Sequence, residues 1–135
     1  MNTGSDTRGV EIHDAQLLGV IVSDGTYVLQ LDAFILDDVE NGHGAGVWQR
    51  VDLRLWKAVV KLTGPYEGWI MDGFARANGT TWEDIIPMPF DESGEIVLSM
   101  IGTNDLSIEV TAERMVLELV GEPTKREEGW LSDET

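Results

Sequence analysis

The fold class is predicted most directly by residues 26–36, Thr-Tyr-Val-Leu-Gln-Leu-Asp-Ala-Phe-Ile-Leu. Asp24-Gly25 separates this segment from an earlier apolar run, and an Asp-Gly pair in that position is a strong hairpin signal. Side chains alternate between the two faces of a strand, so every second residue is expected on one face. That set is Tyr27, Leu29, Leu31, Ala33 and Ile35. The segment therefore predicts a central strand of a β-sheet.

Residues 47–62 predict a second long strand whose apolar face changes along its length. Up to Leu55 the apolar residues occupy odd positions, and after it they occupy even positions, beginning at Trp56. A one-residue change of phase is typical of a β-bulge. We expect a bulge or bend near Leu55 and Trp56, with the Trp56 side chain in the core. Arg50, Asp52 and Arg54 share the other face and are expected to form cross-strand charge pairs.

Further short strands are predicted along the rest of the chain. The candidates are residues 16–22, 69–76, 80–86, 95–101, 106–111 and 114–120. Both faces of residues 16–22 are apolar, which predicts burial on both sides. A tight turn is expected at Ala77-Asn78-Gly79 and a reversal at Ala112-Glu113, whereas Gly121-Glu122-Pro123 is expected to end the last strand. Pro87 and Pro89 predict an edge or crossover, because proline cannot donate to a β-ladder.

Strands at this spacing, without a helical stripe, predict an all-β domain. We expect an antiparallel β-sandwich, jelly-roll-like or a partly closed barrel, of about eight to ten strands. A chain of 135 residues suits one domain, with residues 1–9 and 124–135 as flexible tails. There is no cysteine, no long apolar run and no basic-then-apolar start, which together favour a cytoplasmic protein.

The charge of the chain restricts its partners. Asp and Glu number 25 against nine Lys and Arg, giving a formal net charge of -16. Nucleic acids and anionic membranes would be repelled, whereas a basic protein would be attracted. The same acidity could instead serve solubility alone. The chain is expected to be a monomer or a homodimer.

Acidic residues on predicted loops are the candidate contacts for a basic protein partner, because charges there have the fewest neighbours to pair with. These residues are Asp37, Asp38, Glu40, Asp91, Glu92 and Glu95. The first three also lie close enough together in sequence to suggest a calcium-binding loop, although their spacing does not match an EF-hand.

Tryptophan offers an alternative function. Five tryptophans occur, and Trp69 and Trp82 lie on what is predicted to be one hairpin. If both were exposed on one face, they could stack against a sugar or another small ligand, assisted by calcium at the acidic loop. The alternative prediction is therefore a small-ligand or carbohydrate-binding β-sandwich module.

Residue types typical of catalysis are scarce. The pair His13-Asp14 resembles part of a metal-dependent hydrolase site, but His43 is the one other histidine in the sequence. No nucleophile elbow, phosphate-binding loop or dinucleotide fingerprint is present. We expect no enzymatic activity, no cofactor and no metal site, and expect His13 or Asp14 to satisfy backbone groups where the first strand begins.

The opening of the chain resembles a group of small bacterial proteins of uncharacterised function. Residues 13–20, His-Asp-Ala-Gln-Leu-Leu-Gly-Val, followed by a hairpin into residues 27–33, are similar to the start of that group. Residues 86–89, Ile-Pro-Met-Pro, and 117–123, Leu-Glu-Leu-Val-Gly-Glu-Pro, are also similar. Some proteins with this opening are regarded as immunity proteins of polymorphic toxin systems, acidic antidotes that block a toxin by binding it. The resemblance implies a non-enzymatic binding protein.

Overall fold

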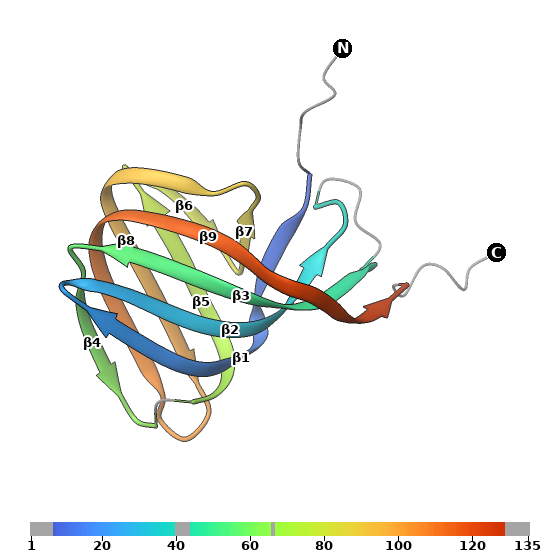
Figure 1. The fold of residues 1–135 in the computed structure, drawn as a ribbon, viewed down its shortest axis with the longest axis horizontal. Coiled ribbons are helices and arrows are strands. Elements are labelled where there is room, and N and C mark those ends of the chain that lie inside the picture. The colour runs from blue at the N-terminus through green and yellow to red at the C-terminus, as the bar shows by residue number, and fades with distance from the viewer. Residues whose placement is uncertain (1–6, 40–43, 66, 129–135) are drawn as a thin grey trace, which may run out of the picture.

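The computed structural model describes residues 7–39, 44–65 and 67–128, and within them it contains nine β-strands and no helix. Figure 1 shows the strands wrapped around a common interior. The strands are β1 (Gly9–Ser23), β2 (Thr26–Leu36), β3 (Gly46–Trp56), β4 (Val59–Thr63), β5 (Gly68–Ala77), β6 (Thr80–Glu83), β7 (Ile85–Pro87), β8 (Asp91–Gly102) and β9 (Ser107–Glu127). The all-β prediction is confirmed.

The sheet closes on itself. Its strand order is β6-β5-β8-β9-β3-β2-β1-β7, and an additional pairing joins β5 to β1. Strands β1, β2, β3, β9, β8 and β5 therefore form a six-stranded barrel, while β4, β6 and β7 extend it at the margins. The prediction of a jelly-roll-like sandwich is wrong, because the strands form one closed sheet rather than two packed sheets. Residues 16 and 17 of β1 pair with residues 69 and 68 of β5, a closing contact that no local sequence signal reports.

The barrel interior is filled by apolar side chains. Along β2, Leu29, Leu31, Ala33 and Ile35 are buried and Tyr27 packs partly against them, as the alternation predicts. Inward residues from β1, β3, β5, β8 and β9 complete one continuous core. A small barrel of this kind is a packed structure rather than an open channel.

The two predicted tight turns are confirmed. Asp24 and Gly25 have φ of 49° and 79°, and they join Ser23 to its partner Thr26. Asn78 and Gly79 have φ of 52° and 92° between β5 and β6. Positive φ at both central residues is the type I′ geometry, whose twist matches that of the flanking strands.

The predicted bend in residues 47–62 lies at Lys57, whose φ is 50°. It divides the segment into β3 and β4, which both pair with β9, so the chain bends without leaving the sheet. The prediction that Trp56 is in the core is wrong. Trp56 is half-buried on the outside, where the Arg114 guanidinium lies 4.5 Å from its ring centroid.

Four predictions about strand bounds are wrong. Residues 106–111 and 114–120 belong to one strand, β9, because β8 on one side and β3 and β4 on the other satisfy its backbone throughout. That strand also continues past Pro123, and residues 125–127 pair with residues 46–48. Gly9 and residues 124–127 were predicted to lie in flexible tails. They are instead the first residue of β1 and the last residues of β9. Conversely, residues 80–86 are divided into β6 and β7 at Asp84, whose φ is 68°.

Strand β1 is buried on one face only, contrary to the prediction for residues 16–22. Leu17 is fully buried, whereas Leu18 and Ile21 are 41% and 50% exposed on the outer face. Val22 faces the same side as Val20 and is 57% exposed, because the barrel wall is incomplete beside it. The apolar outer face of this strand is therefore in contact with solvent. The reason is that a closed barrel has an outside, and among the described residues no second layer covers it here.

The two adjacent leucines test this orientation. Leu17→Ala should lower the free energy of unfolding by about 2–5 kcal/mol, because it leaves a cavity in the core. Leu18→Ala should lower it by less than about 1 kcal/mol. Urea denaturation followed by tryptophan fluorescence measures both values. Equal losses for the two variants would show that both faces of β1 are covered.

Candidate functional site

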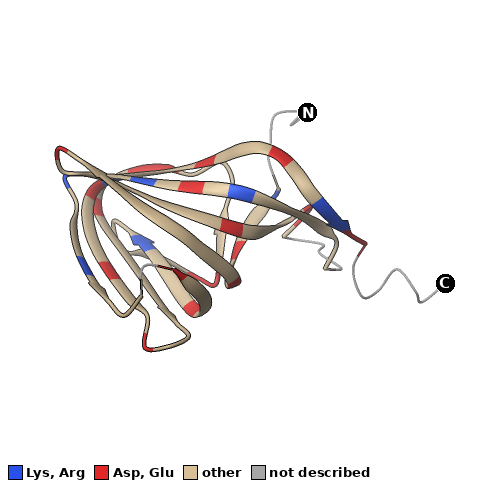
Figure 2. Ribbon diagram, turned by 60° about the horizontal axis from the view of Figure 1, so that its bottom comes forward, with Lys and Arg blue, Asp and Glu red and all other residues tan. Residues whose placement is uncertain are grey.

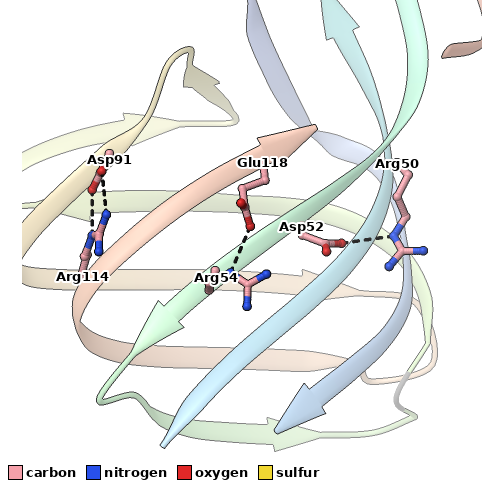
Figure 3. Close-up of polar contacts among 6 residues, drawn as sticks. All are labelled: Arg50, Asp52, Arg54, Asp91, Arg114 and Glu118. Atoms are coloured by element: carbon pink, nitrogen blue, oxygen red, sulfur yellow. Dashed lines mark hydrogen bonds and ion pairs between the residues drawn. The ribbon is translucent and has the colours of Figure 1, made fainter. Parts of the chain in front are cut away.

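The outer surface of the barrel has a charged side and a neutral side. On the charged side, Arg50 Nε lies 3.2 Å from Asp52 Oδ1 on β3, and Arg54 Nε lies 3.0 Å from Glu118 Oε1 on β9 (Figure 3). The pairing between β3 and β9 confirms the predicted cross-strand charge pair for Arg54. Within each ion pair the two opposite charges cancel, so these pairs offer little net attraction to a partner.

The neutral side is formed by the outward residues of β4, β9, β8, β5 and β6. The strand registers place these residues in three cross-strand rows. The rows are Val59, Thr111, Val97, Arg76 and Thr81; Lys61, Glu109, Ser99, Phe74 and Glu83; and Thr63, Ser107, Ile101 and Asp72. Their strand neighbours Leu98, Met100, Ile108 and Val110 are buried, so these rows face outward.

Uncharged side chains occupy most of this grid, and Glu109 lies among them on β9, between Ser107 and Thr111. We define the neutral face as Val59, Phe74, Val97, Ser99, Ile101, Ser107 and Thr111. Val59 is 72% exposed and Ile101 is 51% exposed. Trp69 and Met71 extend the exposed apolar surface toward the start of β5. Clustered apolar surface of this kind, bordered by charge, is typical of a protein-binding site.

The neutral face is hollowed rather than convex. A shallow hollow of about 460 Å³ is lined by Val59, Phe74, Val97, Ser99 and Thr111, together with the charged Lys61 and Glu109. A second hollow of about 430 Å³ adjoins it at Val97 and Thr111. A third, of about 160 Å³, adjoins it at Phe74 and Ser99. Protruding side chains of a partner could be received across the whole face.

Charged side chains around these hollows are mainly acidic. The acidic ones are Asp72, Glu83, Glu95, Glu109 and Glu113, and the basic ones are Lys61 and Arg76. Arg76 is held in place, because its guanidinium lies 5.4 Å from the Phe74 ring centroid and its Nε donates to Thr81 Oγ1 at 2.9 Å. Figure 2 shows the same excess of acidic positions over the whole barrel.

The five described residues among the six acidic ones predicted as contacts are not brought together. Asp37 accepts hydrogen bonds from the Arg126 guanidinium, and Asp38 lies next to it after β2. Glu40 lies outside the described residues. Asp91, Glu92 and Glu95 lie in β8 rather than in a loop, and Asp91 accepts two hydrogen bonds from Arg114, at 2.9 and 3.0 Å (Figure 3).

Of these six residues, Glu95 is at the edge of the neutral face, where it borders the second hollow. The expectation that loop charges lack partners is wrong for Asp37 and Asp91. In both cases an arginine on β9, distant in sequence, reaches the carboxylate. The Arg114 hydrogen bonds also lower the pKa of Asp91.

The two tryptophans predicted to stack against a ligand are also separated. Trp69 is 51% exposed on the outside of β5. Trp82 packs against the core, and its ring meets Phe90 edge-on with centroids 5.2 Å apart. Trp82 pairs with Ala75, six residues along β5 from Trp69, a separation of roughly 20 Å. The pair does not form one stacking platform.

His13 and Asp14 lie at a bulge in the middle of β1, next to the barrel closure. His13 Nδ1 donates to the Met71 backbone oxygen of β5 at 2.7 Å, and the His13 amide donates to Asp84 Oδ1 at 2.8 Å. Asp14 has φ of 69° and lies 3.4 Å from His13 Nε2. The prediction that this pair satisfies backbone groups is confirmed for His13, in the middle of the strand rather than at its start.

The electrostatics of this bulge favour protonated His13. The hydrogen bond to the Met71 backbone oxygen, followed by the Asp14, Asp84 and Glu11 carboxylates, raises the pKa of His13. Burial, followed by the Asp84 carboxylate, raises the pKa of Glu11. Among the described residues, no three His, Asp or Glu side chains are arranged to hold a metal ion.

Comparisons with known proteins were made by family, by sequence and by structure. No protein-family model, curated protein or solved structure matches this chain. In the part of the chain that the structure describes, no helix is long and apolar enough to cross a membrane. The function is therefore inferred from the surface of the barrel.

The neutral face was missed by sequence reasoning, although a signal for it was present. Outward positions of exposed strands are usually polar or charged, but Val97 and Ile101 in β8 are apolar and Ser99 between them is uncharged. Only the register shows that the uncharged outward residues of β4, β5 and β9 lie beside them.

The raised pKa of His13 makes a stability prediction. Protonated His13 should stabilise the fold below the ordinary histidine pKa of 6.5, and this contribution should disappear as pH rises through the raised value. His13→Gln should therefore lower the melting temperature at pH 5.5 and have little effect at pH 8.5. Thermal unfolding followed by circular dichroism measures both. A loss of the same size at both pH values would mean that the His13 charge is unimportant.

Proposed function

We propose that this protein acts by binding a basic protein partner on its neutral face, without catalysing a reaction. The observation that supports the proposal best is the position of a hollowed, mostly uncharged surface among charged side chains that are mainly acidic. Burying Val59, Phe74, Val97 and Ile101 against a partner would supply the main favourable free energy. The acidic border would select the partner by charge.

Charge complementarity favours a basic partner. A net charge of -16 raises the rate of encounter with a cationic protein and opposes association with DNA, RNA or a second copy of the same chain. Five acidic and two basic side chains border the hollows, so the local field has the same sign as the global one. Lysine and arginine around an apolar centre on the partner would match this arrangement.

The resemblance to immunity proteins suggests a partner class. An antidote needs a surface that covers its toxin rather than a catalytic site, and a broad hollowed sheet face suits that purpose. We propose a basic toxin as the partner on this ground. The small-ligand alternative has less support, because Trp69 and Trp82 lie apart.

A pair of variants that each add one positive charge to β9 tests the docking face. Thr111 borders two of the hollows, whereas Thr124 lies near the other end of the same strand, and both are exposed. A partner captured from a lysate of the source organism would be purified, and its affinity for each variant would be measured at low salt. Thr111→Arg should weaken binding at least about tenfold, which corresponds to about 1.4 kcal/mol.

Thr124→Arg is the matched control, because it adds the same charge to the same strand. Its affinity should stay within about twofold of the original, and raising the salt concentration should weaken binding of both the original protein and this control. Equal affinity of the two variants would remove the neutral face as the docking surface. Binding that does not change with salt would contradict the role of acidity.

A further inference from the structure

A second surface is formed where the barrel wall is incomplete. Residues 18–23 of β1 form a ladder with β2 on one side, and among the described residues no strand pairs with their other side. Strand β4 pairs with β9 and likewise has an unpaired edge. In Figure 1 the end of β1 and β4 lie at the same end of the barrel, opposite the end at which β1 begins and β9 ends. Two unpaired edges therefore lie close to each other.

The other edges of the sheet are short or protected. Strands β6 and β7 have four and three residues, and β7 ends in Pro87. Short edges and proline are common means of preventing unwanted strand pairing. By contrast, residues 18–23, Leu-Gly-Val-Ile-Val-Ser, contain neither charge nor proline. This edge lacks the features that would prevent another strand from pairing with it.

A hollow of about 260 Å³ lies between the two unpaired edges. We call it the notch, and it is lined by Val20 and Val22 of β1, Tyr27 of β2, and Val60 and Leu62 of β4. Val20, Tyr27, Val60 and Leu62 pack partly against the core, and Val22 is 57% exposed. The notch thus exposes the margin of the apolar interior. The Ala58 amide donates to the Gly25 oxygen at 3.0 Å and joins the two sides at one end.

Backbone groups of β1 point into the notch at defined residues. In a two-residue hairpin the pair that flanks the turn is hydrogen-bonded, and hydrogen-bonded and non-hydrogen-bonded pairs alternate from there. Ser23 with Thr26 is that first pair, so Ile21 and Gly19 also bond to β2. The amide and carbonyl groups of Val20 and Val22 consequently point away from β2, toward the unpaired edge.

The two edges are suited to a single added strand. Across the notch β1 and β4 run in opposite directions, because Ala58 before β4 bonds to Gly25 after β1, whereas Gly68 beyond β4 pairs with Leu17 of β1. One inserted strand could therefore be antiparallel to β1 and parallel to β4. The edge of β1 has six residues and β4 has five, so a segment of five or six residues would fill the opening.

The charges at the ends of the notch indicate what kind of segment would fit. Asp24 lies at the hairpin end, and Glu67 lies at the other end, in the loop between β4 and β5. Both are exposed and neither forms an ion pair with a described residue. Between them, the lining of the notch is apolar. A second copy of the chain would bring two charges of -16 together, which disfavours self-pairing.

We infer that the notch binds an extended segment of a partner protein by β-strand addition. The segment would carry alternating apolar side chains facing Val20, Val22, Val60 and Leu62, with lysine or arginine at its ends near Asp24 and Glu67. Main-chain hydrogen bonds to Val20 and Val22 would supply affinity, and the apolar pockets would supply specificity. This inference is independent of the neutral face, because it concerns different residues and a different mode of recognition.

A designed peptide tests the inference directly. The probe is a nine-residue peptide in which three valines alternate with two threonines between pairs of lysines. Amide hydrogen exchange by nuclear magnetic resonance would be measured on the full chain with and without saturating peptide. The Val20 and Val22 amides should exchange at least about tenfold more slowly with peptide, because they become hydrogen-bonded. The Gly19 and Ile21 amides are already bonded to β2 and should change much less.

Two control peptides separate strand addition from other binding. A peptide N-methylated at alternate residues cannot form the ladder, and a glutamate-flanked peptide has the wrong charge. Neither should protect Val20 and Val22. Protection by the methylated peptide would overturn strand addition in favour of simple apolar contact. If raising the protein concentration without peptide protected the Val20 and Val22 amides, the edge would pair with a second copy, and the inference would be wrong. If no peptide protected these amides, the inference would also be wrong.

Two protein variants complete the test. Val22→Lys places an ammonium group at an exposed position of the notch and should abolish peptide binding while leaving the circular dichroism spectrum unchanged. Thr111→Arg alters the neutral face and should bind the peptide as the original chain does. If Thr111→Arg also lost the peptide, the notch would not be an independent site and the inference would be wrong.

Discussion

Closure of the barrel between β1 and β5 is the constraint on which the rest of the structure depends. The direct ladder there is short, at residues 16 and 17 against 69 and 68, and a bulge in β1 precedes it. Before the bulge, β1 pairs with β7, and after it β1 pairs with β5. His13 and Asp84 bridge the change of neighbour with side-chain hydrogen bonds. Without this closure the apolar interior would lie open along two strands.

Closure also explains why the outer surface is divided. A barrel turns one face of every strand inward, so the outward residues are not constrained by the core and can differ from one side to the other. On β3 and the second half of β9 they are paired charges. On residues 97–101 of β8 and the first half of β9 they are valine, serine, isoleucine and threonine, with Glu109 among them. The neutral face is therefore a property of the outward positions and contributes little to the fold itself.

The unpaired edges result from the same geometry. The bend at Lys57 carries β4 along β9 and away from β2, while β1 extends beyond its short contact with β5. Each of these two strands is left with an edge that the barrel does not use. In a chain this acidic, electrostatic repulsion can keep copies apart while leaving the edge available to a segment of opposite charge. Acidity and an unprotected edge are thus compatible in one protein.

The sequence by itself determined the all-β class, the inward set of β2, and the two Asp-Gly and Asn-Gly hairpins, because alternation and turn chemistry are local. The sequence patterns predicted Trp56 in the core, two strands in place of β9 and burial of residues 16–22 on both faces. These predictions are wrong, because each outcome depends on which strand lies alongside. Tertiary structure alone decided that β1 meets β5, that Arg114 and Arg126 reach Asp91 and Asp37, and that uncharged residues of four strands form one face. Such contacts join residues far apart in the chain, and alternation specifies a side of a strand but never its neighbour.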